Sequence, residues 1–128
     1  MSYYFSKTVD GPFDAAVERV KAALKKEGFG VLTEADVGKV LREKLGVDFR
    51  PYRILGACNP PLAHKALTAE DKIGTMLPCN VIVQELPSGK VEVAAIDPVA
   101  SMAAVGNPAL EPVGREVRER LKAVVDRL

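Results

Sequence analysis

The sequence lacks the features of membrane, secreted and nucleic-acid-binding proteins. Its apolar runs extend over only a handful of residues, whereas a membrane-spanning helix needs about 20. The N-terminus lacks the basic segment and apolar stretch of a signal peptide. Charge of one sign is also missing, because 18 basic residues nearly cancel 17 acidic ones. These absences predict a cytoplasmic protein that neither enters a membrane nor binds nucleic acid.

Cysteine, histidine and glutamine are scarce as well. Two cysteines in a cytoplasmic chain are more often free thiols than a structural bridge, and no close-spaced Cys-x-x-Cys motif points to a metal site. His64 is the only histidine and Gln84 the only glutamine. With nine prolines and only three asparagines and three methionines, the composition is in keeping with a thermophilic source. We expect the chain to fold without a metal or a disulfide.

The length of 128 residues, with 48% hydrophobic residues, predicts one domain spanning 1–128 with a core of its own. Alternating and β-branched segments predict strands over 2–9, 29–33, 52–58, 81–86 and 91–96. Helices are predicted between Pro12 and Gly28, and over 36–45, 59–67 and 110–127. Residues 70–77 are expected to be irregular or one helical turn, and 97–109 a loop with one turn.

The apolar stripes of the two long helices predict how the elements pack. The stripes consist of Phe13, Val17, Val20 and Leu24 in one helix and Val113, Val117, Leu121 and Val124 in the other. A five-stranded sheet covered on one face by these helices would bury both stripes, and also the stripe of residues 36–45. Because Pro87-Ser88-Gly89 joins two strands as a hairpin, the fold class is α+β, a two-layer sandwich with a mostly antiparallel sheet. Glu111–Arg115 and Glu116–Arg120 are expected to pair along the last helix.

One edge of this sheet gathers the candidate functional residues. If strands 52–58 and 81–86 run antiparallel, Cys58, Cys79 and Asp97 meet at the same edge. His64, on the connecting helix, would lie over that edge, and Met102 could reach it. Each cysteine precedes an asparagine. The candidate ligand-binding residues are Cys58, Asn59, Cys79, Asn80 and Asp97.

Several kinds of chemistry suit this cluster, and no catalytic residue can be assigned. A soft metal such as copper or zinc could bind Cys58, Cys79 and His64. A cysteine thiolate with His64 as base could act as a nucleophile, or the two thiols could form a reversible disulfide. The plainer interpretation is that the cysteines and Met102 pack in the core, His64 is solvated and Asp97 caps a turn.

Four segments resemble a known bacterial and archaeal family. They are Phe29–Glu34, Tyr52–Pro61, Leu77–Val83 and Ala95–Pro98, which carry the Cys-Asn-Pro and Leu-Pro-Cys-Asn motifs. Over nearly the whole chain the sequence is similar to the family called domain of unknown function 302. The resemblance implies a fold similar to one decorated repeat of the TATA-box-binding protein, and a dimer. It implies no activity.

The leading interpretation is a binding module that holds a small ligand or a soft metal ion at the Cys58/Cys79 edge, as a homodimer. The alternatives are a thiol-dependent enzyme or redox sensor, and a structural or interaction protein whose cysteines only pack. The dimer is expected because two helices cover one face of the sheet and leave the other open. Residues 99–109 and the outer hairpin positions Ile82, Ala94 and Ile96 are expected to form the interface.

Overall fold

The computed structural model describes residues 2–128 and confirms the predicted mixed fold. The strands are β1 (Tyr4–Val9), β2 (Gly30–Asp36), β3 (Tyr52–Cys58), β4 (Cys79–Glu85) and β5 (Val91–Ile96). The α-helices are α1 (Phe13–Lys26), α2 (Val37–Leu45), α3 (Pro60–Ala69), α4 (Pro98–Met102) and α5 (Glu111–Asp126). Three 3-10 helices complete the order: η1 (Asp71–Met76), η2 (Ala103–Val105) and η3 (Pro108–Leu110).

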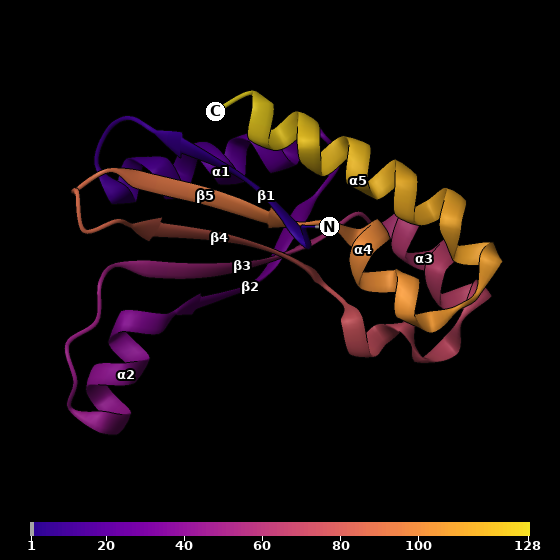
Figure 1. Cartoon of the computed structure of the whole chain (residues 1–128), viewed down its shortest axis with the longest axis horizontal. Helices are drawn as coiled ribbons and strands as arrows, with labels where there is room; N and C mark the ends of the chain where they lie inside the picture. Colours follow the sequence, from indigo (N-terminus) through magenta and orange to yellow (C-terminus); the bar gives the residue numbers. More distant parts are fainter. Residues whose placement is uncertain (1) are drawn as a thin grey trace.

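The five strands form one antiparallel sheet in the order β1-β5-β4-β3-β2 (Figure 1). The first strand, β1, forms one edge of the sheet beside the last strand, β5, and β2 forms the other edge. The antiparallel pairing of β3 with β4, assumed from the sequence, is confirmed. The ends of β3 and β5 and the start of β4 therefore lie at the same end of the sheet.

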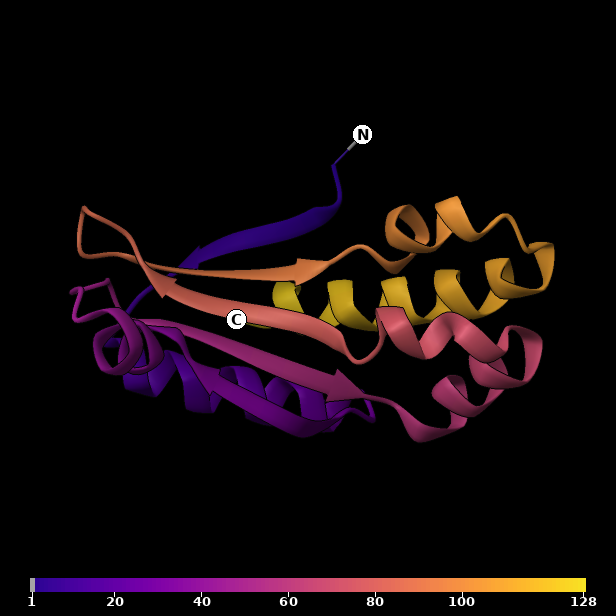
Figure 2. The ribbon, with the colours of Figure 1, turned by 90° about the horizontal axis from the view of Figure 1, so that it is seen from below.

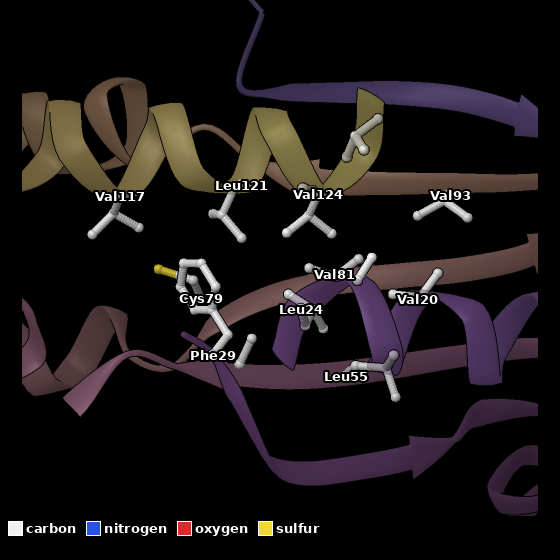
Figure 3. Close-up of a cluster of buried hydrophobic side chains, with 14 of the residues drawn as sticks. Val20, Leu24, Phe29, Leu55, Cys79, Val81, Val93, Val117, Leu121 and Val124 are labelled. Atoms are coloured by element: carbon white, nitrogen blue, oxygen red, sulfur yellow. The ribbon is translucent and has the colours of Figure 1, made fainter. Parts of the chain in front are cut away.

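Helices α1 and α5 cover one face of the sheet, as predicted (Figure 2). Their stripes interlock with alternate residues of the central strands, so that Leu24 and Leu121 pack over Val81 (Figure 3). Gly28 ends the first of these helices with a φ of 84°, a left-handed conformation that glycine adopts without strain. Within residues 2–128, no helix has the length and apolar character to cross a bilayer.

The stripe predicted for residues 36–45 is not buried, contrary to expectation. Helix α2 lies beyond the β2 edge of the sheet, apart from α1 and α5 (Figure 1). Leu45 is 69% exposed and Val40 is 47% exposed. The helix-covered face is already filled by the two longer helices, so the stripe of α2 finds no place there.

Residues 97–109 are more helical than the predicted loop. They form α4, η2 and η3, which pack against α5 at one end of the molecule (Figure 1). Met102 and Leu110 are buried there. Ala103, Ala104, Pro108 and Ala109 remain exposed, and the place of residues 99–109 at a dimer interface stays a prediction.

Gly56 in the central strand β3 is predicted to tolerate no side chain. A Cβ at this position would lie 2.1 Å from Thr33 Oγ1 and 2.7 Å from Pro78 Cγ. Gly56→Ala should therefore lower the free energy of unfolding by about 1–3 kcal/mol, the usual cost of overpacking, in urea denaturation. Gly30→Ala is the matched control, because nothing lies within 4 Å of its Cβ position. Equal stability of the two variants would contradict this packing.

Candidate functional site

The predicted site residues lie at one end of the sheet, but the two thiols lie on opposite faces. Cys79 pairs with Ala57 in the β3–β4 ladder, and both residues lie on the face of the sheet that the helices cover. Cys58 follows Ala57, so strand alternation directs it to the other face, where Gly56 meets Pro78. Cysteines whose Cβ atoms diverge in this way do not form a disulfide without backbone movement. Both cysteines are free.

Cys79 is part of the core (Figure 3). It is 8% exposed and borders a cavity of about 30 Å³, which is room for little more than a water molecule. Burial, reinforced by the nearby Cys58 thiolate when that is charged, raises the pKa of the Cys79 thiol to about 11. Cys79 is therefore protonated at neutral pH and is neither a ready nucleophile nor a ready metal ligand.

Asn59 and Asp97 are helix caps. The side chain of Asn59 accepts a hydrogen bond from the Leu62 backbone N–H at 3.3 Å, which caps α3. Asp97 Oδ1 accepts from the Val99 N–H at 3.0 Å and caps α4, and its Oδ2 accepts from Arg118 Nε at 3.1 Å. Both residues are buried, and these hydrogen bonds satisfy their side-chain oxygens. Neither side chain is free to hold a ligand through the oxygens that it already uses.

His64 lies on the exposed side of α3, whereas Leu62 and Ala66 face the core. Within residues 2–128, no three or more His, Cys, Asp or Glu side chains form a group that could hold a metal ion. The structure thus does not gather Cys58, Cys79 and His64 into the predicted copper or zinc site.

Asn80 is the predicted residue that faces an open site. It is exposed and pairs with Gly56 in the ladder, so it lies on the sheet face away from α1 and α5. There it lines a shallow cleft of about 350 Å³. The cleft is bordered by Tyr3, Tyr4, Tyr52, Asn80, Ile82, Gln84, Glu92, Ala94, Ala95 and Ile96.

All three tyrosines of the chain lie around this cleft. Tyr4 is placed there by its pairing with Ile96, and Tyr52 by its pairing with Gln84. The sequence analysis identified Ile82, Ala94 and Ile96 as outward-facing but missed the tyrosines. Alternation indicates which face of its own strand Tyr4 or Tyr52 shares, but only the order of the strands in the sheet brings the two side chains to this cleft.

A chain of hydrogen bonds closes one end of the cleft. Arg50 Nε donates to Gln84 Oε1 at 2.9 Å, and Gln84 Nε2 donates to Glu92 Oε1 at 2.9 Å. The Arg50 guanidinium also lies 4.3 Å from the centroid of the Phe49 ring and 5.6 Å from that of Tyr52. Among the described residues that line the cleft, Glu92 alone is charged, and Gln84 holds it in place.

The raised pKa of Cys79 predicts a loss of stability at alkaline pH. The folded state binds this proton more tightly than the unfolded state does, so its contribution is complete below about pH 8.5 and is lost as the pH approaches 11. The free energy of unfolding should fall over this range by about 2–3 kcal/mol more in the wild type than in Cys79→Ala.

Cys58→Ala is the matched control for this prediction and should keep most of the alkaline loss. Denaturation in urea at several pH values, under reducing conditions, measures the difference. Both single variants and the double variant should remain folded, because a buried cysteine contributes roughly 1–2 kcal/mol. Parallel pH profiles for wild type and Cys79→Ala would contradict the assignment of the buried thiol.

Comparisons with known proteins place this arrangement in a family. No curated protein matches the chain. The chain is similar to a solved structure described as an uncharacterised conserved DUF302 protein from Bacillus stearothermophilus, with 32% identity and a TM-score of 0.93. The match covers 99% of this chain and 98% of that one. Residues 5–128 also match the profile of the family described as domain of unknown function DUF302, and the chain belongs to that family.

Proposed function

We propose that the protein is a small-ligand binding module whose site is the cleft on the open face of the sheet, with Asn80 as its main polar contact. The observation that carries the proposal is the gathering of all three tyrosines around one cleft. The size of about 350 Å³ lies at the lower end of the range for small-molecule sites. The proposed ligand site therefore lies on the open face of the sheet and not on the helix-covered face that carries Cys79.

The lining of the cleft defines a class of ligand. Ile82, Ala94 and Ile96 provide an apolar floor, and the tyrosine rings at its margins offer flat surfaces for stacking. The Asn80 amide can both donate and accept a hydrogen bond. A planar, uncharged heteroaromatic compound with a polar edge matches this combination, because it needs no charged partner.

A thiol-dependent enzyme is less well supported. Cys79 holds its proton and faces the core, and His64 belongs to the exposed side of a helix whose inner side faces the core. Thiol chemistry needs a thiolate in an accessible, electropositive setting. Cys58 is half-buried and does not line the proposed ligand cleft.

Tyrosine NMR signals provide a direct test of the ligand site. The protein has three tyrosines and no tryptophan, so selectively labelled tyrosine rings report on the cleft alone. Titration with nicotinamide and adenine as planar probes, and with cyclohexanol as an apolar probe, should shift the Tyr4 and Tyr52 signals saturably for the planar probes. Asn80→Ala should weaken binding about tenfold, the cost of roughly one good hydrogen bond.

His64→Ala is the control, since its exposed side chain lies outside the cleft, and it should bind like the wild type. Tyr52→Leu keeps an apolar side chain but removes the ring and should also weaken the planar probes. The proposal is wrong if no probe shifts these signals saturably at about 10 mM, where a millimolar site would be mostly occupied.

Homodimerisation is a second proposal for the same face, favoured by its unpartnered apolar surface. Five strands spaced about 4.8 Å apart and roughly 20 Å long present about 500 Å² of flat face. A standard interface buries roughly 800 Å² per partner, so the open face alone would supply most of one. With a net charge of +1, two copies repel each other little.

Sedimentation equilibrium at micromolar concentration tests the dimer. We expect a mass near twice the chain mass of 13.8 kDa, and Ile96→Glu, which buries a charge in the proposed interface, should restore the monomer. Thr68→Glu on the exposed side of α3 is the control and should leave the mass unchanged. A mass of one chain at every concentration refutes the dimer and leaves the ligand proposal standing.

A further inference from the structure

A second cleft, separate from the open sheet face, lies between α5 and the segment formed by α4, η2 and η3. It encloses about 350 Å³ and shares no lining residue with the tyrosine cleft. Its apolar wall comes from Val99, Met102 and Leu110. Gly114 of α5 faces this wall, because a Cβ at that position would lie 3.8 Å from Met102 Sδ and 3.9 Å from Val99 Cγ2. The absence of a side chain there keeps the cleft open.

The polar lining of this cleft divides into one fixed and two free groups. Asn107 is fixed, since its Oδ1 accepts from the Ala109 N–H at 3.0 Å and its Nδ2 donates to the Ala69 carbonyl at 3.0 Å. Glu111 and Arg115 are exposed and lie one turn apart on α5. The ion pair expected between them is not formed, and within residues 2–128 neither has a salt-bridge partner, unlike Glu116 and Arg120, which pair at 3.4 Å.

Two opposite, unpaired charges beside an apolar wall define the ligand that fits. A cation alone would face the Arg115 guanidinium, and an anion alone would face the Glu111 carboxylate. A zwitterion places its ammonium group at Glu111 and its carboxylate at Arg115, whose planar guanidinium can bind a carboxylate with two hydrogen bonds. Side chains one helical turn apart are about 5–6 Å apart at Cβ, close enough to serve one amino-acid backbone.

We propose that this cleft binds a free α-amino acid with an apolar side chain, which would rest against Val99, Met102 and Leu110. The cleft is large enough for leucine or methionine. Such a molecule would pair with both unpaired charges and also cover the apolar wall of the cleft. This site is independent of the one proposed on the open sheet face.

Three ligands that share the isobutyl side chain of leucine test the proposal on the wild-type protein. L-Leucine carries both charges, isoamylamine the positive charge alone and 4-methylpentanoate the negative charge alone. Backbone amide NMR signals of Gly106 and Gly114, which line the cleft, should shift saturably with leucine. The two singly charged analogues should bind at least about tenfold more weakly, because each loses one charge-assisted interaction.

Substitutions then assign the two charges. Arg115→Gln and Glu111→Gln should each weaken leucine binding about tenfold, and Glu119→Gln, an exposed acid on α5 outside the cleft, is the control. Arg115→Gln should abolish the advantage of leucine over isoamylamine. Equal affinity for the three ligands, no saturable shift at about 10 mM leucine, or unchanged binding in both variants would each overturn the proposal.

Discussion

The antiparallel register of β3 and β4 is the constraint on which the rest of the structure depends. It pairs Leu55 with Val81 and Ala57 with Cys79, and thereby sends one set of alternate residues toward α1 and α5. A shift of one residue would exchange the faces of both strands. The same register that buries the core therefore also decides that Cys79 is a core thiol and that Asn80 faces solvent.

Caps at the strand ends explain why polar residues that are close in space do not form one site. Each of β3 and β5 runs directly into a helix, and a helix leaves its first N–H groups without partners. Asn59 and Asp97 supply those partners at the starts of α3 and α4. Their side-chain oxygens thus already accept hydrogen bonds where the chain passes from strand to helix. The end of the sheet is therefore rich in polar groups but poor in groups that are free to bind a ligand.

The sequence predicted the fold well because its signals are local. The stripes of α1 and α5 and the hairpin each follow from spacing within one segment. The stripe of α2 has the same spacing, yet the covered face has no room for it, and this depends on the whole sheet. The cysteines were candidate site residues because of their residue type, whereas the face of the sheet on which each one lies depends on the register of the strands. The tyrosine cleft needs β1 beside β5, a long-range order that the periodicity of β1 does not contain.

The surfaces of this two-layer fold differ in the chemistry that they offer to a ligand. The face of the sheet under the helices is closed by apolar packing. A ligand could therefore bind only on the open face of the sheet or in a cleft beside the connecting segments. On the bare face the floor is uncharged, and its one charged lining residue, Glu92, is held by Gln84. Beside α5 the floor is also apolar, but Glu111 and Arg115 are unengaged. Recognition without charge on the open face, and by two opposite charges beside α5, would let one small domain distinguish two unlike ligands, because neither cleft offers the contacts that the other ligand needs.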